Sequence, residues 1–480
     1  MDQKSKSGRN RILLTLVPVL LAISLVAVGV VTMGCPVPAG VAPEPVAPEQ
    51  AGAENRNVIF FHPDGYGLSH WNALRFLLVG PDGKLNWDRL PYMAPYTEHM
   101  KDALTAGSHG GATVHAYGVK VVSDSFGLDG HQELTALSGK KMSIMEEAIA
   151  AGFATALVQT GEITEPGTAV FVSSVEERDN REEIARQVIE SGVDVILSGG
   201  ERFLLPESVT GRHGKGARKD GVNLIERAKA LGYTVVYTRD ELMAVPATVS
   251  KVLGVFAHGH TFNDTTEERL RAEGLPLYVP GAPTIAEMSA AALEFLSRNP
   301  KAAEKGIFLV AEEEATDNFP NNANARGSFE AGKRADEAFG VFVEFVANNP
   351  NTLLITAADS SAGGKHIIGP DPAWMARLLV DGKLGEADIN SGPDGKFVRA
   401  PVDGIDGAGT EPFLAAADKA GNRWPFAVTW ATRHDLSGGI VARAKGLNAE
   451  RVTELGVVDN TDIYRIMYYT LFDRWLPAFP

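Results

Sequence analysis

The sequence predicts an α/β fold with a mostly parallel central sheet and helices on both faces. Short β-favouring runs alternate along the chain with runs that repeat apolar residues at helical spacing. Several of the β-favouring runs are followed by a carboxylate, and in such sheets the chemistry sits at the carboxyl ends of the strands. The composition, 44% hydrophobic and 22% charged over 480 residues, suits one large domain with insertions, or two domains.

The expected elements follow one another from residue 57. Strands are predicted for NVIFF (57–61), ATALVQ (154–159), VDVILSGG (193–200), YTVVY (233–237), GIFLVAE (306–312) and TLLITAAD (352–359). Helices are predicted at 140–152, 180–192, 221–232, 283–300 and 327–350, where apolar residues recur at helical spacing. Such alternation implies right-handed crossovers within one sheet.

Glycine, proline and aspartate break this pattern from 364 to 423. We interpret that stretch as an insertion or a set of long loops near the active face. The chain then returns to the pattern with a strand in PFAVTWAT (425–432), which ends just before His434.

The N-terminus is typical of an exported protein. Basic residues precede an uncharged apolar run at 12–34, and Cys35 follows at once, so 1–35 is predicted to be a lipoprotein signal with Cys35 lipidated. The alternative is an uncleaved anchor, because the run can span a bilayer. Either places the protein in the bacterial cell envelope, on the periplasmic or extracellular side. A Pro/Ala-rich tether (36–56) then leads to the catalytic domain, 57–480.

The net charge argues against a nucleic-acid-binding protein, and the cysteine count excludes an intrachain disulfide. The net charge of −15 leaves no broad basic surface, so no nucleic-acid-binding surface is expected. With a single cysteine, an intrachain disulfide is impossible despite the expected oxidising compartment.

Carboxylates at the ends of predicted strands indicate a metal site. Asp64 follows the strand at 57–61, Glu312 follows GIFLVA, and Asp359 follows TLLITAA. One such aspartate is commonly only a turn or cap residue. Several on one sheet favour a shared cation site.

Five segments, taken in order, resemble the alkaline phosphatase family from about residue 57 to the C-terminus. They are NVIFFHPDGYGLS, SHGGATVHAYGVK, VDVILSGGERF, LGVFA and the long run PTIAEMSAAALEFLSRNPKAAEKGIFLVAEEEATDN. The resemblance implies hydrolysis of phosphate monoesters through a phosphoserine intermediate. It also implies two catalytic metal ions and one structural ion, zinc and magnesium, small phosphorylated substrates, and a possible homodimer.

The resemblance assigns the catalytic residues. Ser108, at a helix start in TAGSHGG, matches the nucleophile, and Thr105 is the next candidate. Gly107 stands where many relatives have aspartate. Arg178 matches the arginine that grips the phosphate, although an arginine in the charged run EERDNREE could also be an ordinary surface residue.

Only some of the metal ligands that the resemblance implies match those of the family. The aspartates and His434 are nevertheless expected to converge within roughly 5–8 Å of one another. Asn321 and Ser360 replace two imidazole ligands, so the oxygen-rich set could favour Mg²⁺, Mn²⁺ or Ca²⁺. His109 or His366 could supply a missing nitrogen. Thr168 matches the structural-metal threonine after a one-residue shift, since Gly167 occupies the ungapped position. The full set is Asp64, Thr168, Glu312, Asp317, Asn321, Asp359, Ser360 and His434.

Two other functions are compatible with this sequence. A phosphodiesterase of the same superfamily would share the fold, whereas a sulfatase is disfavoured because no Cys-x-Pro-x-Arg or Ser-x-Pro-x-Arg motif is present. The altered ligand positions also allow a degenerate, non-catalytic phosphate- or metal-binding protein. Retention of the nucleophile and most carboxylates argues against that reading.

Overall fold

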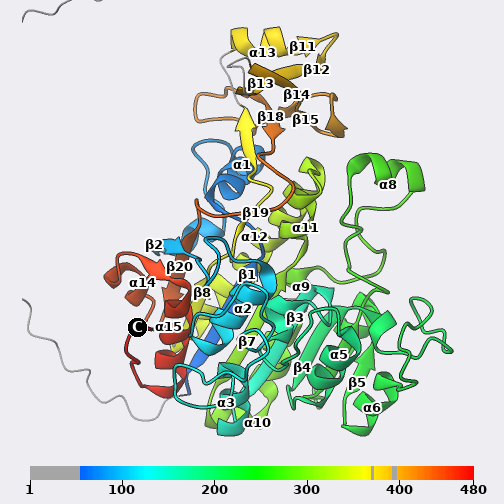
Figure 1. The fold of residues 1–480 in the computed structure, drawn as a ribbon, viewed down its shortest axis with the longest axis vertical. Coiled ribbons are helices and arrows are strands. Elements are labelled where there is room, and N and C mark those ends of the chain that lie inside the picture. The colour runs from blue at the N-terminus through cyan, green and yellow to red at the C-terminus, as the bar shows by residue number, and fades with distance from the viewer. Residues whose placement is uncertain (1–54, 369–371, 392–396) are drawn as a thin grey trace, which may run out of the picture. The chain divides into compact units, whose positions relative to one another are not determined.

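The structure is a computed structural model that describes residues 55–368, 372–391 and 397–480 (Figure 1). It contains a large, mostly parallel sheet covered by helices, as predicted, with the strand order β21-β2-β20-β8-β1-β7-β3-β4-β6-β5. The export signal (1–35) and the tether as far as residue 54 lie outside the described residues and stay predictions. Among the described helices, none combines the length and the apolar content needed to cross a bilayer.

The strands of the large sheet are β1 (Asn57–Pro63), β2 (Tyr92–Thr97), β3 (Ala154–Glu162), β4 (Val195–Gly199), β5 (Thr234–Val236), β6 (Val252–Val255), β7 (Ile307–Glu313), β8 (Thr352–Thr356), β20 (Val441–Gly446) and β21 (Val458–Asp459). All neighbours from β8 to β5 pair in parallel. Strand β20 pairs antiparallel with both β8 and β2. The predicted strands correspond to β1, β3, β4, β5, β7 and β8. Strands β2, β6, β20 and β21 were not predicted. Exposed and polar residues interrupt the apolar positions of β2 and β20, and β6 and β21 have only four and two residues.

Helices of the large sheet include α1 (Leu68–Val79), α2 (Ser108–Tyr117), α3 (Ile144–Ala151), α4 (Pro166–Ala169), α5 (Arg181–Glu190), α6 (Leu224–Ala230), α7 (Arg239–Met243), α8 (Glu267–Glu273), α9 (Ile285–Arg298), α10 (Pro300–Glu304), α11 (Ala315–Asn321), α12 (Ala325–Asn348), α14 (Arg451–Glu454) and α15 (Asn460–Phe472). Helices α3 and α9 begin at capping boxes, in which Ser143 and Thr284 accept hydrogen bonds from the backbone N–H three residues later. These caps fix where two of the predicted helices start.

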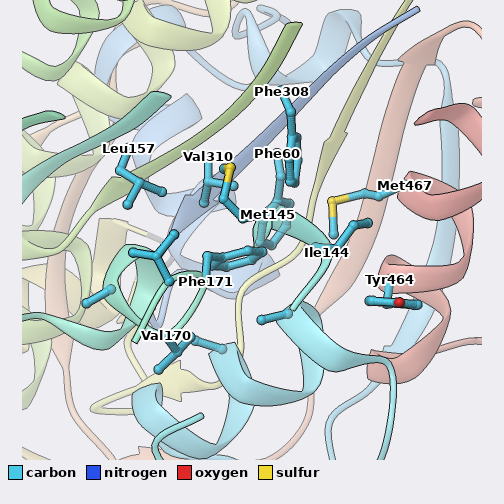
Figure 2. Packing of buried hydrophobic residues seen from close by; sticks show 14 of the residues in the cluster. Phe60, Ile144, Met145, Leu157, Val170, Phe171, Phe308, Val310, Tyr464 and Met467 are labelled. Carbon is cyan, nitrogen blue, oxygen red and sulfur yellow. The ribbon is translucent and has the colours of Figure 1, made fainter. Parts of the chain in front are cut away.

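The sheet has an apolar core on each face because strand residues alternate between faces. On one face, Phe60 of β1 and Phe308 of β7 pack against α2, α3, α5 and α15. Figure 2 shows this core, with Phe171, Tyr464 and Phe60 among its labelled side chains. On the other face, residues of β1 and β7 pack against α9 and α12. Both faces are therefore buried, and the carboxyl ends of the strands are left as the place for a site.

The interrupted region folds into a second, smaller sheet. This second sheet consists of β10 (His366–Ile368), β15 (Asp403–Gly404), β16 (Gly407–Ala408), β17 (Phe413–Leu414) and β18 (Pro425–Thr429). Between β10 and β15 along the chain come α13 (Pro372–Leu378) and two separate two-stranded pairs, β11 (Leu379–Val380) with β12 (Lys383–Leu384) and β13 (Glu386–Ser391) with β14 (Phe397–Pro401). The strand expected at 425–432 is β18, and it pairs with β10, β15 and β17. A two-stranded pair, β9 (Ser361–Ala362) with β19 (Asp435–Leu436), precedes the return to the large sheet at β20. The second sheet thus extends past the predicted insertion.

Candidate active site

A row of polar side chains crosses the carboxyl ends of three adjacent strands. His62 of β1 is paired in register with Glu312 of β7, and Glu312 is paired with Gln159 of β3. Residues in register on adjacent parallel strands project to the same face. All three are buried. This row forms the floor of the candidate site.

Two aspartates at the ends of β1 and β8 lie beside this row. The Nε2 atom of His62 is 3.1 Å from Asp64 Oδ1 and 3.8 Å from Asp359 Oδ1. Asp359 Oδ1 also accepts a hydrogen bond from the Gly65 backbone N–H at 3.4 Å. Both aspartates are fully buried. The structure thus brings together the two carboxylates that the sequence placed at neighbouring strand ends.

Gly65 allows a third carboxylate to reach this turn. Its φ of +60° lies in the left-handed region, and a Cβ there would stand 2.5 Å from Asp317 Oδ1. Only glycine satisfies both the backbone conformation and this close approach. The first turn of α11 can therefore pack its Asp317 carboxylate directly on the turn that carries Asp64.

Ser108 lies near the same carboxylates and belongs to a different element, the helix α2. It is the first residue of α2, and Gly107, not Ser108, occupies the N-cap position. Its side chain lies near enough to Asp64 to help lower the pKa of that carboxyl, and Gly111, one turn later, packs against Asp359. A helix N-terminus presents free backbone N–H groups and a partial positive charge, which favour anions. The hydroxyl thus lies near the carboxylate cluster and at an anion-stabilising helix end.

Many buried oxygens here lack a hydrogen-bond donor. They are Asp64 Oδ2, Asp359 Oδ2, Ser360 Oγ and both carboxylate oxygens of Glu312. Buried polar atoms in folded proteins are normally paired, and buried charges are paired or coordinate metals. The concentration of unpaired oxygens at one point fits a site built for divalent cations.

The pKa values in the cluster reflect this crowding. Burial raises the pKa of Glu312 and of Asp359 well above the ordinary value, and the negative charge of Asp64 adds to the effect. Burial, together with the charges of Asp435 and Asp64, also raises the pKa of Asp317. Burial opposes ionisation of Asp64 as well, but the adjacent His62 ring and the neighbouring polar side chains lower the pKa of Asp64 to about 2. Without cations, this cluster therefore holds protons.

Metal affinity is accordingly expected to fall as the pH is lowered from about 8 to about 5, because cations must displace those protons. The sign follows from the raised pKa values of Glu312, Asp317 and Asp359: the stability that these groups contribute to the metal-free protein is present below the ordinary carboxyl pKa and is lost as the pH rises through the raised values. Calorimetric titration of metal-stripped protein in buffers of different ionisation enthalpy counts the released protons. A pH-independent affinity without proton release would contradict this prediction.

The structure places Asn321 among the carboxylates of the cluster and His434 at the surface. The Nδ2 atom of Asn321 donates to Asp317 Oδ2 at 3.0 Å and to Asp435 Oδ1 at 2.9 Å. Its Oδ1 accepts from the Gly363 backbone N–H at 3.0 Å, so the oxygen is already engaged. His434 is exposed, and its neighbour Asp435 points into the cluster instead. The antiparallel pairing of β19 with β9 sets this orientation, since side chains alternate along a strand.

Thr168 is close to Glu312 but is bonded elsewhere. It lies in the short helix α4, and its Oγ1 accepts a hydrogen bond from Gln159 Nε2 at 2.6 Å. Gly167 is the residue against the carboxylate, since a Cβ there would stand 1.8 Å from Glu312 Oε1. Helix α4 thus packs tightly over Glu312 because residue 167 is glycine, and Thr168 contacts the row through Gln159.

Arg178 is held beside the site by an acidic network. Its Nη2 donates to the buried Glu165 at 2.8 Å, and Arg181 Nη1 donates to the other oxygen of Glu165 at 2.6 Å. The charges of Glu165 and Asp64 offset the effect of burial and raise the pKa of Arg178, which stays protonated. The side chain is 32% exposed. The guanidinium can therefore contact a ligand that enters from solvent while Glu165 holds it in position.

The two remaining histidines considered as replacements differ in their surroundings, and the buried Nδ1 of His109 has no hydrogen-bond partner. His109 Nε2 is bonded to Asp124 at 2.9 Å, and His366 is exposed, with Nδ1 bonded to the Gly364 carbonyl. The side chains that sequence reasoning missed are His62, Glu165 and Asp435. His62 could have been found from its place two residues before Asp64, on the same side of the strand.

Comparison with known proteins shows the family of this chain. A family model described as alkaline phosphatase matches residues 55–472. The chain belongs to the alkaline phosphatase family. Alkaline phosphatase of Escherichia coli strain K12 is 28% identical over 355 residues, covering 66% of this chain and 72% of that protein. The tissue-nonspecific isozyme of Rattus norvegicus is 26% identical over 463 residues, covering 86% and 83% respectively.

Solved structures show the alkaline phosphatase fold. Thermus thermophilus alkaline phosphatase matches with a TM-score of 0.66 and 24% identity, covering 88% of this chain and 93% of that one. A variant of TAB5 alkaline phosphatase with Mg bound in its M3 site matches with a TM-score of 0.61 and 20% identity, covering 88% and 99%. Family membership supports hydrolysis of phosphate monoesters at the level of the family, and the acidic groups of this chain could hold a metal ion.

Proposed function

We propose that this protein hydrolyses phosphate monoesters through a phosphoserine intermediate on Ser108. The observation that carries the proposal is the position of that hydroxyl. It stands at the first residue of α2, near Asp64, beside a cluster of buried carboxylates several of whose oxygens lack donors. A nucleophile, an anion-stabilising helix end and cation ligands therefore meet at one point.

The residues of this chain divide the work of phosphoryl transfer. The Ser108 oxygen attacks phosphorus, a new P–O bond forms to the serine, and the bond to the leaving alcohol breaks. The backbone N–H groups at the start of α2 and the guanidinium of Arg178 face the negative charge that spreads over the phosphoryl oxygens. Water then cleaves the phosphoserine and releases phosphate. Asp64, whose pKa the nearby Ser108 side chain helps to lower, is positioned to orient the hydroxyl.

Asp64, Asp359 and Glu312 are proposed to hold divalent cations, with Asp317 and Asp435 as further carboxylate ligands. When bound, such ions supply charge neutralisation at the phosphate and activate the attacking and leaving oxygens. Zinc and magnesium are expected from the family. The oxygen-rich donors also suit Mg²⁺, Mn²⁺ or Ca²⁺.

Turnover of p-nitrophenyl phosphate tests the proposed function. Protein purified without chelator is analysed for metals, stripped, and assayed with each metal restored. We expect hydrolysis that depends on a divalent cation, with bis-p-nitrophenyl phosphate cleaved more slowly. A faster rate on the diester would indicate a phosphodiesterase.

A non-catalytic binding protein is the second candidate, because the Asn321 amide already bridges Asp317 and Asp435 where a cation would be needed. It predicts phosphate binding without turnover under every metal condition.

Arg178→Ala is expected to lower kcat/KM for p-nitrophenyl phosphate by about 10²-fold, because a charge-assisted, forked contact to two phosphate oxygens is lost. Most of the loss should appear in KM if the guanidinium grips the ground state. Arg186→Ala is the matched control, since Arg186 lies on α5 and pairs with Glu183 and Glu190 at the surface. Equal rates for the two variants would show that Arg178 does not contact the phosphate.

A further inference from the structure

His62 is a buried imidazole inside the carboxylate cluster. Its ring is 1% exposed, and it lies on β1, two residues before Asp64. A single histidine in an apolar strand is more often a core residue than a ligand. The surroundings of its two ring nitrogens decide between these roles.

One ring nitrogen fixes the state of the other. His62 Nδ1 is 2.8 Å from the carbonyl oxygen of Ala357, which can only accept, so Nδ1 carries the hydrogen. In the neutral ring, Nε2 then carries the lone pair. Imidazoles that bind metals commonly donate their other N–H to a carbonyl or carboxylate in this way, which fixes the tautomer and orients the ring.

The lone pair faces carboxylates instead of a hydrogen-bond donor. Nε2 lies 3.1 Å from Asp64 Oδ1 and 3.8 Å from Asp359 Oδ1. His62, Asp64 and Glu312 each offer one ligand atom, and these atoms lie within 4.8 Å of one another. The remaining oxygens of all three carboxylates have no donor. A protonated His62 ring would supply only one positive charge to three buried carboxylates. A divalent cation would neutralise two of their negative charges and would also be coordinated by the unpaired oxygens.

The position of His62 also suits the replacement of an imidazole that this sequence lacks next to Asp359. Ser360 stands next to Asp359 where the family has an imidazole, and its buried hydroxyl is without a partner. His62 lies on β1, which is adjacent to β8, and its ring is 3.8 Å from Asp359. The imidazole nitrogen that is absent after β8 can therefore be supplied by His62. The neighbouring His115 is not free in the same way, because its Nε2 is 2.7 Å from the Tyr96 hydroxyl.

We infer that His62 Nε2 is a nitrogen ligand of the cation held by Asp64 and Asp359, in place of the imidazole absent at Ser360. The group formed by Asp317, Asn321 and Asp435 has only oxygen acceptors and an amide donor. The two halves of the centre are therefore chemically unlike. The half containing His62 suits zinc or another nitrogen-preferring ion, and the other half suits a hard ion or stays without one. This inference deepens the proposed metal-dependent function and rests on it.

The direct test uses the unaltered protein loaded with Cu²⁺ after metal stripping. Pulsed electron paramagnetic resonance detects the nitrogen of a coordinated imidazole, and growth on ¹⁵N-histidine must change that signal. We expect imidazole coupling in the full chain and its loss in His62→Gln. An absence of imidazole coupling in the unaltered protein would overturn the inference, and this measurement does not depend on a variant folding.

Affinity provides the second measurement. We expect His62→Gln to lower zinc affinity by about 100-fold or more and magnesium affinity by much less, since only zinc strongly prefers nitrogen. His115→Gln is the matched control, because its ring is equally buried with its centroid 5.7 Å from that of His62. Unchanged zinc affinity in a folded His62→Gln protein would also overturn the inference. If the coupling and the zinc loss appear but no phosphate ester is hydrolysed, the proposed function alone fails.

Discussion

Replacing Ser108 by alanine is expected to lower turnover of phosphate monoesters by about 10³-fold or more. The hydroxyl is the only part removed, and it is the atom that attacks phosphorus in the proposed reaction. Its removal should leave the protein folded, because Gly107 and not Ser108 caps α2, and the side chain makes no capping hydrogen bond. The free energy of unfolding should change by about 1 kcal/mol or less.

Thr105→Ala is the matched control for this experiment. Thr105 lies three residues before Ser108 and is the alternative nucleophile suggested by the sequence. Steady-state kinetics on p-nitrophenyl phosphate, together with a thermal unfolding curve, separate chemistry from stability. Full activity in Ser108→Ala, or a comparable loss in Thr105→Ala, would move the nucleophile away from Ser108.

Asp64→Asn is expected to remove both tight metal binding and activity. Asp64 contacts His62, and Asp359 and Ser108 lie near enough to help lower its pKa, so its charge is expected to serve the cation and the nucleophile together. The loss of metal affinity should exceed the roughly 10–100-fold that follows removal of a partner outside the coordination sphere. Metal content after dialysis and turnover with restored metal measure the two effects.

Asp336→Asn controls for the loss of a buried aspartate as such. Asp336 is also buried, but it accepts hydrogen bonds from the backbone of Asn86 and Trp87, away from the carboxylate cluster. This variant should lose stability, because two backbone donors lose a charged acceptor, while it retains metal stoichiometry. If Asp64→Asn kept its metal and its activity, the centre would have to lie elsewhere.

The fold could be predicted because the decisive signals are local. The apolar runs at 57–61, 306–312 and 352–359 become adjacent strands, so the carboxylates after them meet at one edge of the sheet. That follows from the period of the pattern and the handedness of crossover connections. The small second sheet could not be foreseen, since its strands are mostly two or three residues long.

The details of the site depended on contacts between distant segments. Whether His434 or Asp435 faces the cluster depends on the pairing of β19 with β9, and a shift of one residue in a strand reverses the side chain. The role of His62 depends on the Ala357 carbonyl, which lies 295 positions away along the chain. The orientation of the Asn321 amide depends on a backbone N–H from the loop at Gly363. Each of these partners is distant in the sequence from the residue that it orients, so a local sequence pattern does not reveal it.

Trapping the covalent intermediate tests the central claim most directly. Full-length, metal-restored protein is mixed with a phosphate monoester, quenched in acid within the turnover time, and digested for peptide mass spectrometry. We predict phosphate on Ser108 in the peptide containing TAGSHGG, and none in protein stripped of metal. Rapid hydrolysis of the ester with no phosphate on Ser108, under conditions where the quench preserves phosphoserine, would contradict the proposed mechanism.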